Sequence, residues 1–208
     1  ILSSQNNFQV NWLTLSFPKN LEKAFQDNYF QNSLRQVRIA LLLGLFFYSL
    51  FGILDAWLVP EAKHKLWLIR YAIFAPYVIA VYVLSFSPHF KKYMQISIAF
   101  GVLIAGLGIT AMILIAPYPA SYSYYAGLLL VFIYGYTFVK LRFVWASVAG
   151  WLIVLAYEIA AIWLSPTPVP ILVNNNFFFL SANILSMLAC YSIEFYLRRD
   201  FMQARICY

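Results

Sequence analysis

The chain has 208 residues, of which 63% are hydrophobic and 10% are charged, whereas a soluble globular domain has roughly 45–50% apolar and about 25% charged residues. This composition excludes a soluble globular domain and predicts a membrane protein. Fourteen Lys and Arg against seven Asp and Glu give a net charge of +7. We interpret this charge as a signal of membrane topology and of contact with anionic membrane lipid, so we expect no nucleic-acid partner. The absence of Met at position 1 favours a fragment of a longer protein.

Six apolar stretches are long enough to cross a hydrocarbon core, which needs about 20 helical residues. The sequence therefore predicts an all-α membrane protein, a bundle of six transmembrane helices. It divides into a cytoplasmic lead-in (1–38), a membrane domain (39–197) and the start of a cytoplasmic signalling helix (198–208). The six expected spans are 39–59, 66–86, 96–116, 122–139, 143–164 and 177–196.

The Lys and Arg residues are distributed unequally between the two sides of these spans. Lys63, Lys65 and Arg70 belong to one side, and the other eleven belong to the opposite side. Cytoplasmic loops carry the excess of Lys and Arg in membrane proteins. The sequence therefore predicts that both termini are cytoplasmic and that helix six continues into the cytoplasm.

Apolar spacing also predicts helices outside the spans. Residues 15–38 place Leu21, Phe25, Tyr29 and Leu34 on a roughly helical spacing, which indicates an amphipathic helix on the inner membrane surface or against a cytoplasmic partner. A solvated lead-in helix is the alternative interpretation.

A second pattern follows the sixth span. Glu194 and Arg198 have the spacing of a favourable helical ion pair, and apolar residues then recur at spacings of 4, 3 and 4. This heptad-like stripe predicts a parallel dimer that feeds a downstream domain, although an ordinary positively flanked helix end explains it equally well. The stripe consists of Leu197, Phe201, Ala204 and Tyr208.

Charged side chains inside a bilayer are costly and point to function by default. Asp55 and Arg70 each lie four residues, roughly 6 Å, inside the outer ends of spans one and two, so an ion pair between them is expected. Glu158 and Asn183 lie level with each other, roughly 9 Å deep, in spans five and six.

We hypothesise that these groups line an outer site for a small molecule, an ion or a lipid headgroup, although purely structural pairing is the alternative. The asparagines expected in the connection before span six and a tyrosine cluster would complete this site. They are Asn174, Asn175 and Asn176, and Tyr118, Tyr122, Tyr124 and Tyr125. No catalytic set and no metal-ligand motif is present in the sequence, so we expect no catalytic residue, metal or cofactor within these residues.

Several segments resemble the six-helix membrane-associated sensor domain that precedes class III adenylate or guanylate cyclase domains in cyanobacteria and other bacteria. The resemblance covers about 17–201; similar modules also precede diguanylate cyclases and histidine kinases. The segments are SLRQVRIALLLGLFFYSLFGILD (33–55), LWLIRYAIFAPYV (66–78), AGLLLVFIYGYTFVKLRFVWASVAGW (126–151), NNNFFFLSAN (174–183) and YSIEFYLRRDF (191–201).

This resemblance implies a homodimeric sensor domain in a bacterial inner membrane. A cytoplasmic cyclase, a lyase that converts ATP to cyclic AMP and pyrophosphate with Mg or Mn, would follow Tyr208. The alternative function from the residues is a small solute transporter or channel subunit, and a plain membrane anchor is a third.

Overall fold

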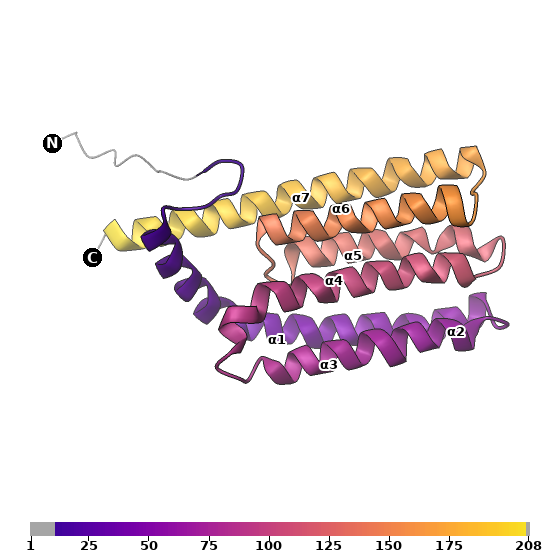
Figure 1. Ribbon diagram of the computed structural model, residues 1–208, viewed down its shortest axis with the longest axis horizontal. Coiled ribbons are helices and arrows are strands. Elements are labelled where there is room, and N and C mark those ends of the chain that lie inside the picture. The colour runs from indigo at the N-terminus through magenta and orange to yellow at the C-terminus, as the bar shows by residue number, and fades with distance from the viewer. Residues whose placement is uncertain (1–10, 207–208) are drawn as a thin grey trace.

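The computed structural model describes residues 11–206, which form helices and no named strand. Six helical rods follow one another along the chain (Figure 1). Their elements are α1 (Lys19–Leu58); α2 (Lys63–Trp67), the π-helix η1 (Leu68–Phe74) and α3 (Ala75–Leu84) as one rod; α4 (Phe90–Ile115); the 3-10 turn η2 (Ala120–Ser123) leading into α5 (Tyr125–Thr137); α6 (Phe143–Ile159) continued by the π-helix η3 (Ala160–Leu164); and α7 (Val169–Ile206).

Five of the six rods are long and apolar enough to cross a membrane, and α5 is the exception among the described residues. The 13 residues of α5 extend over about 20 Å, less than a hydrocarbon core of about 30 Å. Its end is set by Lys140, whose φ of 55° is left-handed and incompatible with a continuing helix. The carbonyl of Lys140 accepts hydrogen bonds from Tyr29 and Gln95, which hold this turn in place.

Two helices are longer than the spans expected within them. The 40 residues of α1 extend over about 60 Å, so this single helix contains both the lead-in and the first span. The 38 residues of α7 pass through the boundary at 197/198 without a break.

The expectation that Asn174–176 lie in a connection is wrong, because α7 begins at Val169 and these asparagines are helical. Pro170, which we assigned to the connection, occupies the first turn of the helix, where a missing N–H costs nothing.

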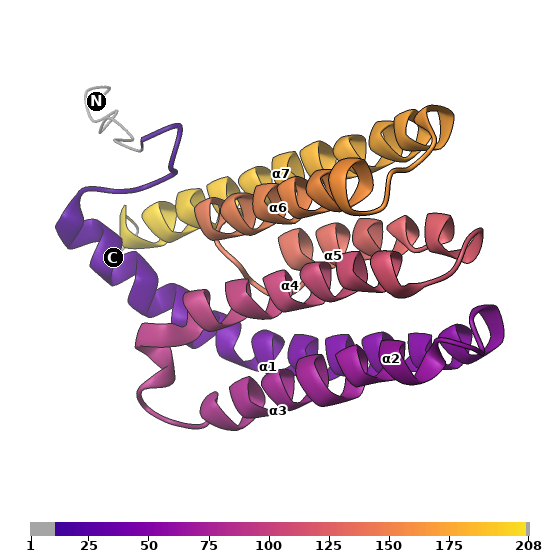
Figure 2. The same ribbon diagram turned by 45° about the vertical axis from the view of Figure 1, so that its right-hand side comes forward.

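The six rods form three antiparallel hairpins, as Figures 1 and 2 show. The beginning of α1 and the end of α7 lie at the same end of the bundle, here called the terminal end; the opposite end is called the far end. Helix α4 packs on α6 and α5 packs on α7, while α1 packs mainly on α2, η1 and α3. The first hairpin joins the other four helices mostly through contacts of η1 and α3 with α4.

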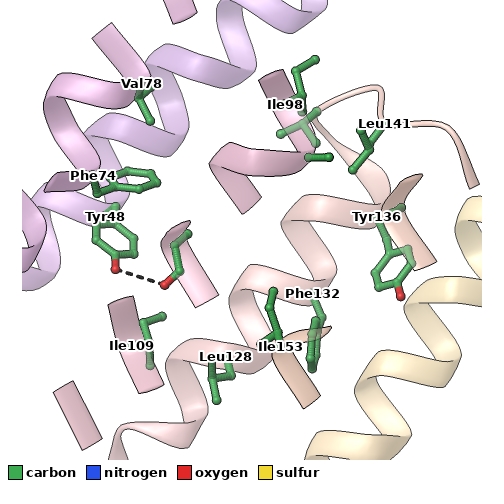
Figure 3. Packing of buried hydrophobic residues seen from close by; sticks show 14 of the residues in the cluster. Tyr48, Phe74, Val78, Ile98, Ile109, Leu128, Phe132, Tyr136, Leu141 and Ile153 are labelled. Carbon is green, nitrogen blue, oxygen red and sulfur yellow. Dashed lines mark hydrogen bonds between the residues drawn. The ribbon is translucent and has the colours of Figure 1, made fainter. Parts of the chain in front are cut away.

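Buried aromatic and aliphatic side chains pack in the interior of the bundle (Figure 3). Phe132 on α5 lies 5.0 Å, between ring centroids, from Phe179 on α7, and both are fully buried. On the side of the first hairpin, the rings of Tyr48 and Phe74 lie 4.0 Å apart, and the Tyr48 hydroxyl donates to the carbonyl of Ala105 at 3.2 Å. These contacts bring polar groups of different helices to fixed positions within the bundle.

Candidate functional site

Asp55 and Arg70 form a buried ion pair near the far end. Arg70 Nε donates to Asp55 Oδ2 at 2.5 Å and Nη2 donates to Oδ1 at 3.1 Å. The side chain of Asp55 is 2% exposed and that of Arg70 is 5% exposed. Such a two-pronged geometry suits a guanidinium and a carboxylate. The ion pair expected from the level positions of these residues is therefore present.

This pair also connects to α5 and to the backbone of α1. The Tyr124 hydroxyl donates to Asp55 Oδ1 at 2.9 Å, and Arg70 Nη1 donates to the carbonyl of Tyr48 at 3.2 Å. The guanidinium carbon lies 4.8 Å from the centroid of the Tyr48 ring. Because each charged group has several partners inside the protein, the pair joins α1, η1 and α5 at one point.

The other expected members of the outer site lie in separate contacts. Asn175 donates to the Tyr157 hydroxyl at 3.3 Å, and Asn183 accepts a hydrogen bond from Tyr136 at 3.0 Å. Tyr125 and Glu158 are partly buried and Asn174 is exposed. Within residues 11–206, no hydrogen bond or ion pair joins Glu158 to Arg70. Of the expected set, the structure joins Asp55 directly to Arg70 and to Tyr124, while Asn175, Glu158 and Tyr125 have Tyr157 as a common neighbour. A ligand role for all of these residues stays a prediction.

The contact around Asn183 is tight because α6 approaches at a glycine. A Cβ added to Gly150 would lie 2.2 Å from the Tyr136 hydroxyl and 2.6 Å from Asn183 Oδ1. Asn183 is fully buried, and its Nδ2 has no hydrogen-bond partner in the described residues. Gly150 therefore allows the close approach of α5, α6 and α7 at this polar contact.

Four charged side chains form a second cluster at the terminal end, here called the charge cluster. It consists of Glu22 from α1, Arg142 from the connection before α6, and Glu194 and Arg198 from α7. Arg198 donates to Glu22 at 2.7 Å and to Glu194 at 2.7 Å. Arg142 donates to Glu22 at 2.8 Å and lies 3.4 Å from Glu194. Each cation thus contacts both carboxylates, and the cluster ties three chain segments together.

Backbone and aromatic groups complete the charge cluster. The N–H of Phe17 donates to Glu22 at 2.9 Å, and the N–H of Phe143 donates to Glu194 at 2.6 Å. Arg198 is fully buried, and its guanidinium carbon lies 4.2 Å from the centroid of the Phe25 ring. Paired charges and cation–π contacts are the conditions under which an arginine tolerates burial.

The sequence identified only half of the charge cluster. The Glu194–Arg198 pair was expected from its spacing, and it is present. Glu22 and Arg142 were missed, because their partners lie far along the chain. The available signal was weak: Glu22 is the acidic residue in the first turn of α1, where a carboxylate is favourable anyway.

Glu22 lies before the expected first span, and the pKa of its carboxyl is lowered. Burial acts to raise the pKa of its carboxyl, but hydrogen bonds from Arg198, the N–H of Phe17 and Gln26 outweigh it. Together they lower the pKa from 4.5 to about 2. The carboxyl of Glu22 is therefore ionised near neutral pH.

The apolar stripe after the sixth span is partly covered by α1. Phe201 packs against Phe25 with ring centroids 5.5 Å apart, and Phe17 lies 6.3 Å from it. Leu197 is partly buried, whereas Ala204 is exposed; Tyr208 lies outside the described residues. Phe201 of the stripe thus contacts the lead-in part of the same chain, and the role of the stripe in a dimer stays a prediction.

Comparison with known proteins gives the family of the chain. A search of curated proteins found no match. The model of the MASE8 family matches residues 53–206, which include the end of α1 and nearly all of the remaining described chain. This match covers more than half of the sequence, and the all-helical bundle with five membrane-long rods agrees with it. The chain belongs to the MASE8 family, a family of membrane-associated sensor domains.

Proposed function

We propose that the chain is the regulatory and dimerising sensor domain of a membrane-bound adenylate cyclase. The catalytic domain follows α7 and makes cyclic AMP and pyrophosphate from ATP with Mg or Mn. Membership of a membrane sensor family supports the sensor role. The resemblance of 33–55, 66–78 and 126–151 to sensor domains of class III cyclases supports the cyclase as the output.

The observation that carries the proposal is the contact between α1 and α7 at the terminal end. Helix α7 is unbroken over 38 residues, about 57 Å, so it connects the far end of the bundle to the charge cluster. There Glu22 of α1 holds Arg198 of α7 through two hydrogen bonds of 2.7 and 3.2 Å. A change in the position of α1 therefore alters its contacts with α7, the helix that leads to the output domain.

The proposed topology places the terminal end in the cytoplasm of a bacterium, with the protein in the inner membrane. The helix bounds and the views in Figures 1 and 2 put eleven of the fourteen Lys and Arg residues at this end. An excess of Lys and Arg is typical of the cytoplasmic side of a membrane protein.

The proposed mechanism is a shift between two arrangements of α1 and α7. A ligand changes the populations of two states only when it binds one of them more tightly. The ion pairs of the charge cluster join three chain segments, so they form in one arrangement and break in the other when α1 moves relative to α7. A homodimer would use the uncovered side of α7, where Leu185, Leu188 and Tyr196 are exposed.

The test is the rate of cyclic AMP production by the full-length natural protein in lipid vesicles, with and without residues 1–208. We expect cyclic AMP from the full-length protein and a changed rate after the deletion. Absence of any nucleotide product, together with solute flux through vesicles that contain the protein, would refute the proposal and favour a transporter.

A further inference from the structure

A cavity of about 670 Å³ lies among α1, α3, α4 and α5. Its volume is within the range of roughly 300–1,000 Å³ that is usual for small-molecule sites. Phe74, Val78, Ile98 and Ile109 belong to its wall and are labelled in Figure 3. The cavity separates the first hairpin from α5, which agrees with the packing of α1 mainly on α2, η1 and α3.

Two tyrosines of the cavity wall reach from the α5 rod to α1, at positions near the two ends of the cavity. Tyr124 donates to Asp55 near the far end, and Tyr134 donates to the carbonyl of Ala40 nearer the terminal end. The two positions on α1 are fifteen residues apart, about 22 Å along the helix. The cavity is therefore an elongated slot that runs along α1.

Between these two bridges the slot opens sideways. Phe47 and Phe51 of α1 line one side of the opening, and Leu130 and Ile133 of α5 line the other. All four side chains are exposed although they line the cavity. Their stretch of α1 belongs to the expected span 39–59, so the opening faces the hydrocarbon of the bilayer.

Tyrosine hydroxyls and the Asp55–Arg70 pair supply most of the polar groups in the wall, and these have partners within the protein; Ser97 and Ser123 are the other polar residues of the wall. The hydroxyls of Tyr48 and Tyr77 donate to the carbonyls of Ala105 and Ser97, at 3.2 and 2.8 Å. The charges of Asp55 and Arg70 neutralise each other. An occupant without charge and without hydrogen-bonding groups is therefore the one that complements this wall.

The size and position of the slot select among apolar occupants. A helix of about 10 Å diameter could lie along the slot only if α1 moved away from α5, and the hydrogen bonds of Tyr124 and Tyr134 to α1 oppose that movement. A single hydrocarbon chain is much narrower than a helix and is the occupant that leaves both hydrogen bonds in place. In the hydrocarbon core, such chains belong to the surrounding lipids.

We propose that this slot is the ligand site of the sensor domain and that it holds an acyl chain of a bilayer phospholipid, an inference that rests on the proposed sensor function. Helix α1 forms one wall of the slot and also carries Glu22, which holds Arg198 of α7. Occupation of the slot sets the distance between α1 and α5, and α1 transmits this to the charge cluster.

The first arm of the test measures where a lipid binds. Full-length protein is placed in vesicles of phosphatidylcholine that contain a photoactivatable phosphatidylcholine, and cross-linked peptides are mapped by mass spectrometry. We expect adducts on the slot residues of α1, α4 and α5. Adducts spread evenly over all lipid-facing helices, or a cross-link to a second copy of the chain at this opening, would overturn the proposal.

Two filling variants and a matched control sharpen this arm. Gly101 belongs to the wall of the slot, and a Cβ added there would meet only the ring of Tyr77, at 3.4 Å. Gly101→Phe therefore adds a large side chain to the wall at a position that accepts a Cβ. Ala126→Phe narrows the opening, and Ala80→Phe makes the same change on an exposed position of α3 outside the slot. We expect about tenfold fewer slot adducts in either filling variant, roughly 1.4 kcal/mol of binding free energy, and the parent level in Ala80→Phe. Unchanged adducts in both filling variants would overturn the site.

The second arm measures cyclic AMP production by the same proteins. We expect Gly101→Phe and Ala126→Phe to shift the rate at least about twofold, and Ala80→Phe to match the parent. Loss of the adducts without any change in rate would show a lipid site that is not the ligand site. A full-length protein that makes no cyclic AMP would refute the proposed function, while the cross-linking arm would still decide whether the slot holds a lipid.

Discussion

Removal of one partner of the Asp55–Arg70 pair leaves an uncompensated charge in a buried place. We expect Arg70→Ala to lower the free energy of unfolding by about 3–5 kcal/mol, the usual cost of breaking a buried ion pair. The measurement is denaturant unfolding in detergent micelles. The double change Asp55→Leu and Arg70→Met is expected to cost less than Arg70→Ala, because it leaves no charge unpaired.

An exposed ion pair in the same chain supplies the control. Lys91 and Asp27 lie 2.8 Å apart, and their side chains are 48% and 43% exposed. Lys91→Ala is expected to change the free energy of unfolding by only about 0–1 kcal/mol. Equal losses for Lys91→Ala and Arg70→Ala would contradict the structural importance of the buried pair.

Glu22 gives the charge cluster a defined dependence on pH. Its pKa of about 2 in the folded protein lies below the ordinary value of 4.5, so its stabilisation is complete above pH 4.5 and is lost as the pH falls toward 2. We expect the difference in thermal midpoint between the parent and Glu22→Gln to be constant at higher pH and to shrink between about pH 4.5 and about pH 2. The charged groups nearest to this position are Arg142 and Arg198, which bind Glu22 directly, and Glu194, which shares both arginines with it. A difference that persists undiminished at the lowest pH would contradict this assignment.

Local spacing in the sequence was sufficient to predict some of these residues as members of a site, but not others. Asp55 and Arg70 were predictable because a short connection fixes the levels of two antiparallel helices. The contact between Glu22 and Arg198 joins positions 176 apart, and no local pattern carries that information. A tyrosine cluster was expected at the far-end site, and its member Tyr124 binds Asp55. The sequence did not show which tyrosine would do so, because side-chain direction changes by about 100° from one helical residue to the next.

At the scale of the elements, Gly150 controls how closely α6 approaches α5 and α7. Gly150→Ala places a Cβ against the Tyr136 hydroxyl and Asn183 Oδ1, and we expect a loss of about 1–3 kcal/mol, the usual cost of overpacking. Gly101→Ala is the matched control, because its Cβ meets only ordinary contacts. Because Gly101→Ala replaces a helical glycine with a better helix former, we expect the free energy of unfolding to stay the same or to rise. Denaturant unfolding of both variants is the measurement, and a more stable Gly150→Ala protein would contradict the close packing described here.

The rotational phase of α7 is a second property of the elements. One residue inserted after Arg199 rotates the following stretch by about 100° and moves Phe201 away from Phe17 and Phe25. We expect this insertion to abolish the effect of the membrane domain on the rate of cyclic AMP production. An insertion of seven residues, which restores the phase to within about 20°, is expected to retain it. Normal regulation in the one-residue variant would exclude helical transmission through α7.

The rods were predictable from hydropathy, and their ends were not. The six apolar stretches correspond to the six rods, because helices are the form in which single apolar segments satisfy their backbone in lipid. The early start of α7 was not predicted because Pro166, Pro168 and Pro170 lie between the expected spans five and six, although Pro170 fits the first turn of a helix. The short α5 escaped it because the left-handed Lys140 is held by Tyr29 and Gln95, which lie far away in the sequence.

At the scale of the whole molecule, α1 is the element that connects the two polar centres. It carries Asp55 near the far end and Glu22 at the terminal end, and it forms one wall of the slot between them. The four-helix unit of α4 to α7 is packed together closely, whereas α1 is separated from α5 by the slot. Movement of the first hairpin against this unit is therefore the change that the fold permits most easily.

The most direct test of this account is the rate of cyclic AMP production by the reconstituted full-length protein with Glu22→Gln, compared with Asp27→Asn. Both substitutions remove one carboxylate from the lead-in part of α1, but only Glu22 holds Arg198. We predict that Glu22→Gln shifts the rate toward that of the protein without its membrane domain and that Asp27→Asn leaves it at the parent value. A Glu22→Gln protein with the parent rate and parent stability would contradict the claim that α1 acts on the output through the charge cluster.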